Sequence, residues 1–287
     1  MTTSVATASA VPPSRGGLGI VLLIGIIPTG LVFLFPFFWM VSNALRPNGE
    51  VLAVPPHLIP SHAEWSNFLK VWLFLPFGRF FLNSALVAGA VSAITLVVSS
   101  LSGYAFARLV FPFRNGLFLI YIGTLMIPPA VLVIPLFLMM NWLGWVNTYQ
   151  ALILPMAFSS FGTFLLRQFF MQIPRELEEA AQMDGASRLR ILVDIILPLS
   201  IPALGLLALF TFTAQWNSFL WPLIVVTDPS HTTLPLGITQ FQSQQGTQWN
   251  YLMAGTTIAV APGVLLTILL QRYIFRGFQI NAGFGGR

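Results

Sequence analysis

Long stretches without a charged side chain limit how this chain can fold more than any other feature. Residues 18–41, 80–107, 115–166, 195–227 and 251–271 contain no Asp, Glu, Lys or Arg. A helix of about 20 apolar residues crosses the ~30 Å hydrocarbon core of a bilayer. Only 7% of the 287 residues are charged, whereas a soluble domain has about 25%. The sequence therefore predicts an all-α integral membrane protein.

The boundaries of these stretches predict six transmembrane helices. Residues 18–42 form the first helix, and residues 80–273 contain the other five. The stretch 115–166 is too long for one helix, and the polar, glycine-containing residues 141–148 divide it into two. We expect the third helix to be kinked, which membranes tolerate because neighbouring helices and water satisfy the freed carbonyl groups. The prolines responsible are Pro128, Pro129 and Pro135.

Segments richer in polar residues connect and flank the predicted helices. Residues 43–79 hold several prolines among charged residues, which favours an exposed and largely irregular loop. Residues 228–250 form a second, glutamine-rich loop. The two chain ends, residues 1–17 and 274–287, are predicted to be tails.

The basic residues indicate which side of the membrane each segment faces. Six spans put both termini on one side, and ten of the 13 Lys and Arg residues fall on that side. Cytoplasmic loops carry an excess of Lys and Arg. We therefore expect a multi-pass protein, in contact with membrane lipid, whose termini are both cytoplasmic. The loop 43–79 is then external, and it holds the other three bases, Arg46, Lys70 and Arg79.

The segment Pro174–Pro202 is the one strongly charged part of the chain. Its first glutamates follow Pro174 at the positive end of a helix dipole. Asp184-Gly185 predicts a stop, because glycine adopts a left-handed turn without steric cost. The pattern indicates a short helix, with Leu177, Ala180 and Ala181 on one face, followed by a second amphipathic run at 186–197. It equally fits an amphipathic connector that lies on the membrane.

The charged segment contains three short motifs: Glu179-Ala180-Ala181, Asp184-Gly185-Ala186, and Leu197-Pro198-Leu199 with Pro202. Together they resemble the EAA loop of ATP-binding-cassette importer permeases. Other motifs are similar to the MalG-like carbohydrate permeases, and the resemblance covers nearly all of residues 32–279. These motifs are Asn83-Ser84, Gly103-Tyr104-Ala105-Phe106-Ala107-Arg108, Leu165-Leu166-Arg167-Gln168-Phe169-Phe170, Trp216-Asn217 with Phe219-Leu220-Trp221-Pro222, and Thr227-Asp228-Pro229 with Thr233-Leu234-Pro235.

The resemblance implies a type I (MetI-like) permease fold with a cytoplasmic coupling helix in the loop 172–198. The residues that would contact a cytosolic ATPase are Glu179, Ala180, Ala181, Asp184 and Gly185. The implied partners are a companion permease, a dimer of the ATPase and an extracytoplasmic solute-binding protein, in a bacterial or archaeal cell membrane. The implied substrate is a sugar, oligosaccharide or polyol.

The residue types present argue against an ATPase, catalytic or metal site within this chain. A phosphate-binding P-loop needs Gly-Lys-Ser/Thr, and the single lysine, Lys70, follows Leu69. We expect no catalytic residue and no bound cofactor here, with ATP and Mg²⁺ held by the partner ATPase. The chain has no cysteine, and its three histidines lie in loops, so no metal site is predicted. The bases flank apolar spans instead of clustering on a polar domain, which argues against nucleic acid.

Three other functions remain open. A stand-alone secondary carrier usually needs ionisable groups inside the membrane, and the predicted spans have none away from their ends. A second possibility is a scaffold or sensor subunit that does not transport. A third is an importer permease for a non-carbohydrate solute, such as glycerol phosphate.

A polar cluster in the fifth span is the candidate substrate path. Amides in hydrocarbon cost free energy unless they are partnered, so Gln215 and Asn217 should face a cavity or another helix. Amides beside aromatic faces suit a neutral polyhydroxylated substrate, which adds Trp216 and Trp221 to the path. Alternatively, the amides bond between helices and the tryptophans belong to an interfacial belt.

Overall fold

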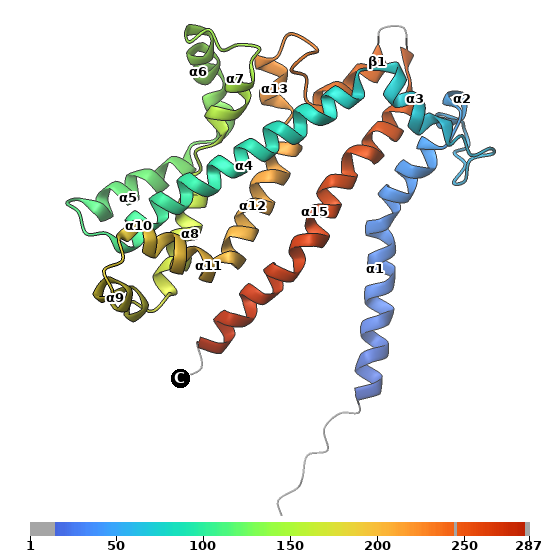
Figure 1. Cartoon of the computed structure of the whole chain (residues 1–287). Helices are drawn as coiled ribbons and strands as arrows, with labels where there is room; N and C mark the ends of the chain where they lie inside the picture. The colour runs from blue at the N-terminus through green and yellow to red at the C-terminus, as the bar shows by residue number, and fades with distance from the viewer. Residues whose placement is uncertain (1–14, 244–245, 285–287) are drawn as a thin grey trace, which may run out of the picture.

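The computed structural model of this protein describes residues 15–243 and 246–284, and it is built from helices (Figure 1). Three helices contain a segment long and apolar enough to cross a membrane: α1 (Arg15–Ala44), α4 (Phe77–Arg108) and α15 (Trp249–Phe284). Three bent pairs of helices meet the same criterion when each pair is taken as one span, which gives up to six spans in the described residues. The predicted all-α, six-span fold is confirmed on this basis.

Each bent pair joins short helices across a break of at most 4 residues. The bend is 100° in the first pair, 42° in the second and 81° in the third. The pairs are α5 (Arg114–Gly123) and η1 (Thr124–Met126) with α6 (Pro129–Trp142); α7 (Tyr149–Ile153) and η2 (Leu154–Met156) with α8 (Ser160–Gln172); and α10 (Arg188–Ile191), the π-helix η3 (Leu192–Ile196) and α11 (Leu197–Leu199) with α12 (Ile201–Trp216).

The largest bend confirms the kink expected in the third span. Ile127 has an extended backbone (φ −84°, ψ 117°), because a residue before proline is disfavoured in the helical region. Pro129 then begins α6 at a position where its missing N–H is not needed. Pro135 lies inside α6, which continues through it.

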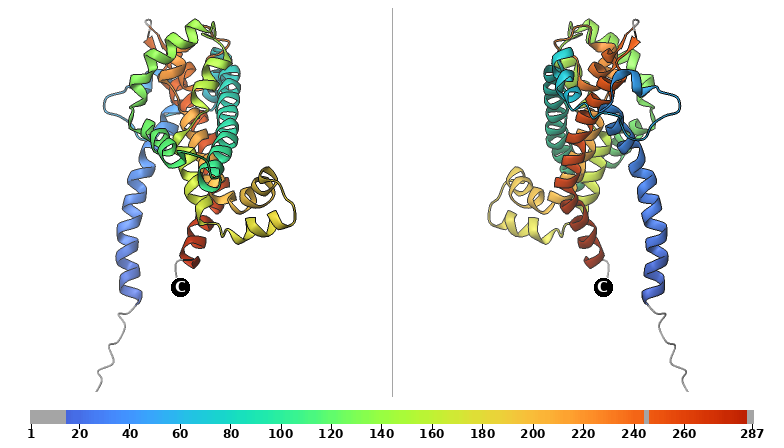
Figure 2. Two further views of the ribbon diagram at one scale, coloured as in Figure 1. Left: turned by 90° about the vertical axis from the view of Figure 1, so that its left-hand side faces the viewer. Right: turned by 90° about the vertical axis from the view of Figure 1, so that its right-hand side faces the viewer.

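Helix α4 packs against both α8 and α12, while α12 packs against α15, and α15 against the peripheral α1 (Figures 1 and 2). Two glycines bring α4 and α8 close together. A Cβ on Gly103 would lie 3.2 Å from a backbone nitrogen of α8, and one on Gly162 would lie 2.5 Å from Ser99 Oγ. Across this contact the hydroxyls of Ser102 and Thr163 are hydrogen-bonded at 2.7 Å. The two helices thus meet almost backbone to backbone.

Residues 43–79 are more regular than the expected loop. They contain α2 (Asn48–Val51) and α3 (Ser66–Phe74). Helix α3 packs against α15 and buries Val71 completely, so burial of an apolar face orders a segment whose prolines suggested irregular structure.

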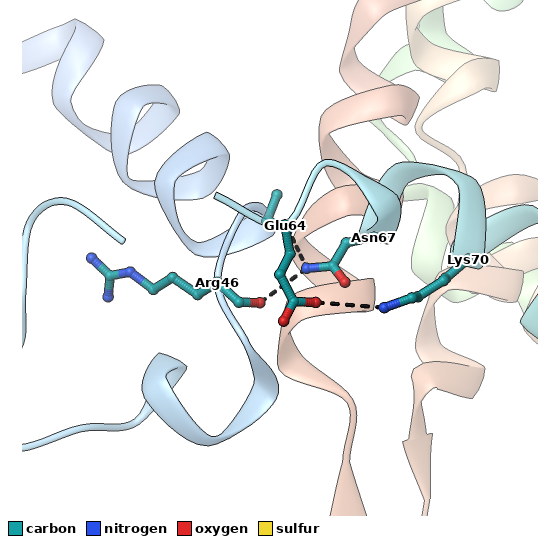
Figure 3. A network of polar contacts seen from close by, with 5 residues as sticks. Arg46, Glu64, Asn67 and Lys70 are labelled. Carbon is teal, nitrogen blue, oxygen red and sulfur yellow. Dashed lines mark hydrogen bonds and ion pairs between the residues drawn. The ribbon is translucent and has the colours of Figure 1, made fainter. Parts of the chain in front are cut away.

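Polar contacts join α3 to the end of α1 (Figure 3). The buried Asn67 side chain donates to the carbonyl oxygens of Ala44 and Arg46, at 2.9 Å each. Beside it, Lys70 Nζ and Glu64 Oε2 form a partly exposed ion pair at 3.5 Å. The Asn67 amide fixes where α3 returns to the bundle, because both of its acceptors lie at the end of α1, before the irregular part of residues 43–79.

The last loop is also partly regular. Helix α13 (Leu220–Val225) precedes this loop, residues 228–250. The loop contains α14 (Leu234–Ile238), η4 (Thr239–Phe241) and an antiparallel pair of two-residue strands, β1 (Gln242–Ser243) and β2 (Gly246–Thr247). Helix α15 then continues to Phe284, so most of the predicted tail 274–287 is helical. Residues 1–14 of the predicted N-terminal tail, and 285–287, lie outside the described residues.

The start of α1 and the end of α15 lie at the same end of the bundle as α9 (Glu176–Met183), which projects from it (Figures 1 and 2). We call this the α9 end. The opposite end holds α2, α3, β1 and α13 (Figure 1).

Candidate functional site

Helix α9 and the turn after it have the geometry that the charged segment predicted. The helix begins at Glu176 with three glutamates in its first turn, where backbone N–H groups favour negative charge. It ends at Met183, with Asp184 as its C-cap, and Gly185 follows with φ +81°, in the left-handed region that glycine adopts most easily. The Ser187 hydroxyl then accepts a hydrogen bond from the N–H of Arg190 and begins α10.

The residues expected to contact an ATPase lie on the surface of this segment. Glu179, Ala180, Asp184 and Gly185 are exposed, and Ala181 is half-buried. In the described part of the chain, the Glu179 carboxylate has no hydrogen-bond or ion-pair partner. The side chain is therefore free to bind a group from another polypeptide.

A groove lies next to this surface. It has a volume of about 260 Å³ and is lined by residues from α9 to η3, among them Ala181, Asp184, Arg190 and Asp194. Arg190 and Asp194 form an exposed ion pair at 3.2 Å along one side. The α9 end thus offers an acidic helix beside a charged groove.

The face of α9 that turns inward is not the apolar one formed by Leu177 and Ala180. Leu177 is 44% exposed and Ala180 is also exposed, whereas Glu178 is only 4% exposed. The Glu178 carboxylate forms a buried ion pair with Arg108, the last residue of α4, with Nε and Oε1 2.7 Å apart. A glutamate can be buried in place of a leucine only when its charge has a partner. Arg108 supplies that partner.

Sequence reasoning missed Glu178 because the adjacent Glu179 has the same chemistry and belongs to the recognisable motif. A weak signal was available. Arg108 ends an otherwise uncharged span and must find an acceptor or reach water. The segment 174–202 holds all five acids on the predicted cytoplasmic side, so one of them was a reasonable partner.

The two tryptophans of the candidate path are buried in packing contacts. Trp216 is 3% exposed and its indole N–H donates to the Ala259 carbonyl in α15 at 2.9 Å. Trp221 is 5% exposed and donates to the Ala151 carbonyl in α7 at 2.9 Å. This placement favours helix packing over substrate contact for both residues.

The two amides of the path are more accessible. Gln215 is half-buried, and Asn217 is exposed at the end of α12, where its Nδ2 donates to the Thr213 carbonyl at 2.8 Å. Asn217 bonds to its own helix and not to another one. Both amides therefore keep polar atoms that a substrate or a second subunit could reach.

Among the described residues, no group of three or more His, Cys, Asp or Glu side chains is placed to hold a metal ion. The acids of the α9 end are instead divided between the buried pair and the surface.

Residues 97–280, from the middle of α4 to near the end of α15, match the protein family described as "Binding-protein-dependent transport system inner membrane component". The chain belongs to this family. The match covers the spans that pack around α4 and the whole α9 segment.

Curated relatives within this permease family align over almost the whole chain. The sn-glycerol-3-phosphate transport system permease protein UgpE of Pectobacterium atrosepticum is 39% identical, over 92% of this chain and 97% of the relative. The trehalose/maltose transport system permease protein MalG of Thermococcus litoralis is 37% identical, over 92% of this chain and 96% of the relative. The probable ABC transporter permease protein YurM of Bacillus subtilis is 34% identical over 85% of this chain.

A solved structure has the same fold. One chain of a bacterial ABC transporter involved in the import of the acidic polysaccharide alginate matches with a TM-score of 0.81. The match covers 93% of this chain and 99% of that chain, at 21% sequence identity. The arrangement of spans is therefore that of an importer permease, as the sequence motifs predicted.

Proposed function

We propose that this chain is the permease subunit of an ATP-driven importer and that α9 docks onto a cytosolic ATPase. One observation carries the proposal: Glu179 lies exposed and unpartnered on a projecting helix, while its neighbour Glu178 is committed to the interior. A carboxylate without an internal partner can accept charge-assisted hydrogen bonds from an arginine or from backbone N–H groups of a partner.

The distribution of basic residues supports a cytoplasmic location for the α9 end and for both termini. ATP and Mg²⁺ are then bound by the partner ATPase, because this sequence has no P-loop lysine. The opposite end faces outward, where a solute-binding protein docks. A related alginate transporter has been crystallised in complex with its pentasaccharide-bound periplasmic protein. A companion permease completes the translocation path.

The substrate that fits best is a neutral sugar, oligosaccharide or polyol. The charge-free stretches place no cation within the spans away from their ends. Arg167, near one end of α8, is already engaged: it lies 4.1 Å from the centre of the Phe118 ring and donates to the Phe106 carbonyl at 3.2 Å. Gln215 and Asn217 are the residues of this chain that would contact hydroxyl groups.

Glycerol phosphate is the second candidate, because the UgpE relative is a transport system permease for sn-glycerol-3-phosphate. A phosphate usually requires arginine or lysine donors along its route. In that case the companion subunit would have to supply them.

Charge reversal tests the docking surface. The chain is co-expressed with its companion permease and ATPase, and the complex is purified through a tag on this chain. Glu179→Lys should reduce the amount of co-purified ATPase and the rate of ATP hydrolysis about ten-fold, as expected for loss of a typical coupling energy. Glu64→Lys, at a partly exposed acid of the opposite end that pairs with Lys70, is the control and should retain both. Full ATPase association in Glu179→Lys would show that the segment is only a connector.

Substrate class is tested in proteoliposomes that contain the complete complex. ATP hydrolysis is measured with the binding protein in the presence of maltose, maltotriose, glycerol or sn-glycerol 3-phosphate. Stimulation by a neutral sugar or polyol supports the first candidate, and stimulation by the phosphate alone overturns it. Transport without any ATPase would support a secondary carrier.

A further inference from the structure

Three helices of the α9 end meet at one side chain, Arg108. It ends α4 and exposes only 4% of its side chain. Its Nε lies 2.7 Å from Glu178 Oε1 in α9. Its Nη2 donates to the carbonyl oxygen of Phe170, at 2.6 Å, and to that of Ile173, both at the C-terminal end of α8. One guanidinium thus connects α4, α8 and α9.

The shape of the guanidinium makes its contact with α8 directional. The last carbonyl groups of a helix have no partner within the helix, so the end of α8 needs donors from elsewhere. Arginine presents its donors in a rigid planar fork, unlike the single rotatable ammonium of lysine. The Nη2 of Arg108 donates two hydrogen bonds to the end of α8, while its Nε contacts the Glu178 carboxylate as an ion pair without hydrogen-bond geometry. Because one guanidinium makes both contacts, it sets the position of α9 relative to α8.

Tyr104 provides a second contact to Glu178. It lies one turn before Arg108 in α4, and its hydroxyl donates to Glu178 Oε2 at 3.3 Å. Both carboxylate oxygens of Glu178 are therefore held by α4.

Apolar packing contributes less to holding α9. Ala181 is its one residue that packs against the neighbouring apolar cluster. Leu177 is 44% exposed and Met183 is 89% exposed. The direction of α9 therefore depends on polar contacts more than on burial of an apolar face, which is unusual for a short helix, since most helical stability in proteins comes from such burial.

We propose that Arg108, Glu178 and Tyr104 form a brace that sets the direction of α9, and that Arg108 and Glu178 are positioning residues for energy coupling. The second part rests on the proposed function of α9. Without the brace, α9 would pivot about its links on either side, and Glu179 would no longer face one fixed direction. The ATPase would then meet a helix whose contact surface must be ordered at the moment of docking.

The direction of α9 can be measured in the chain alone. The protein has no cysteine, so a nitroxide pair can be attached at Met183→Cys and Val110→Cys, two sites 89% and 94% exposed in the structure. The full-length labelled chain is placed in lipid nanodiscs, and the distance distribution between the labels is measured by electron–electron double resonance. We expect one narrow distribution, and about a two-fold broader one in Glu178→Gln, because an amide cannot pair with the guanidinium charge.

Two further variants separate positioning from simple stabilisation. Asp194→Asn is the matched control: it breaks the exposed ion pair with Arg190 in the same segment and should leave the distribution narrow. Arg108→Met with Glu178→Leu removes both charges without leaving one buried and unpaired, so this variant should fold. It should insert normally and still give the broad distribution. A narrow distribution in Glu178→Gln or in the double variant would overturn the brace.

The purified complex then tests coupling. Glu178→Gln should retain bound ATPase but lower the ATP hydrolysis stimulated by the loaded binding protein about ten-fold, in the range of a typical coupling energy. A broad distribution with unchanged stimulated hydrolysis would overturn the positioning role. If Glu179→Lys also leaves ATPase association and hydrolysis unchanged, the proposed docking of α9 fails, whereas the brace itself, measured in the isolated chain, stands.

Discussion

The two ends of the bundle are held together by different chemistry. At the α9 end, a buried ion pair between Arg108 and Glu178 fixes a helix that has little apolar contact. At the opposite end, neutral amides perform the same task. Asn83 Nδ2 donates to the carbonyl oxygens of Ser230 and Thr232, at 2.9 Å each, and the Tyr149 hydroxyl donates to Asn83 Oδ1 at 2.7 Å. Asn67 holds the end of α1 in the same way.

This difference determines how each end responds to damage. A neutral hydrogen bond contributes about 1 kcal/mol net, so losing one changes stability gradually. A buried ion pair contributes little by itself, but removing one partner leaves an uncompensated charge. The neutral Asn83 and Asn67 contacts of the opposite end should therefore tolerate single changes, and the ion pair of the α9 end should respond to them sharply.

The largest effect is expected for Arg108→Ala. This change leaves the Glu178 carboxylate buried without its partner and should destabilise the fold by ~3–5 kcal/mol. Thermal unfolding of the chain in detergent measures the loss. Arg108→Met with Glu178→Leu should recover most of the stability. Equal losses in the single and double variants would mean that packing, and not charge, holds this end.

A smaller loss is expected for Asn83→Ala at the opposite end. The change leaves two carbonyl groups and the Tyr149 hydroxyl without their bonds, at a cost of about 1–3 kcal/mol. Asn217→Ala, which removes one bond within α12, is the control and should cost less. Thermal unfolding of Asn83→Ala and Arg108→Ala, measured side by side, shows at which end a single change costs more stability. If Asn83→Ala costs more, the comparison between the ends is reversed.

A comparable or smaller effect, confined to the α9 segment, is expected for Gly185→Val. A β-branched residue at φ +81° is strained, by about 1–3 kcal/mol. The distance between labels at Met183→Cys and Val110→Cys should change while the spans stay folded. Gly185→Asn should be milder, because asparagine enters the left-handed region more readily. An unaltered distance in Gly185→Val would show that the turn does not direct α9.

The smallest effect is expected from pH at the opposite end. The N–H of Ser230 donates to Asp228 Oδ1 at 2.6 Å, and this bond lowers the pKa of the carboxyl group below its ordinary value. The stability that this hydrogen bond contributes to the fold is fully present above about pH 4, the usual pKa range of aspartate. It is lost as the pH falls through the lower pKa of the folded state. Hydrogen exchange of the Ser230 amide should therefore speed up, relative to its intrinsic rate, only in acid. Asp228→Asn should remove this dependence, and the same acid response in that variant would contradict it.

The sequence predicted features that depend on nearby residues. Charge-free stretches located the spans, Pro128-Pro129 located the sharpest bend, and Gly185 located the turn after α9. Each of these follows from the chemistry of one residue type in its local context.

Features that depend on distant partners were not predictable in the same way. Nothing local distinguishes Glu178 from Glu179, because the choice is made by Arg108, which lies in another span. The order in residues 43–79 similarly depends on Asn67 and Val71 packing at the start of a helix bundle. The sequence left open whether Trp216 and Trp221 contact substrate or pack between helices, because the carbonyl groups that accept from them belong to other helices.

Helix α4 has the geometry of a lever. Its 32 residues make it about 48 Å long at 1.5 Å per residue, and it packs closely against α8 at Gly103 and Gly162. Near one end it grips α9 through Arg108. Near the other, Asn83 and Ser84 hold the segment from Ser230 to Leu234. A tilt of roughly 5° about one end would move the other by roughly 4 Å over this length. A displacement of α9 would therefore reach the segment from Ser230 to Leu234 through rigid-body tilting of one helix, without a series of smaller rearrangements in between.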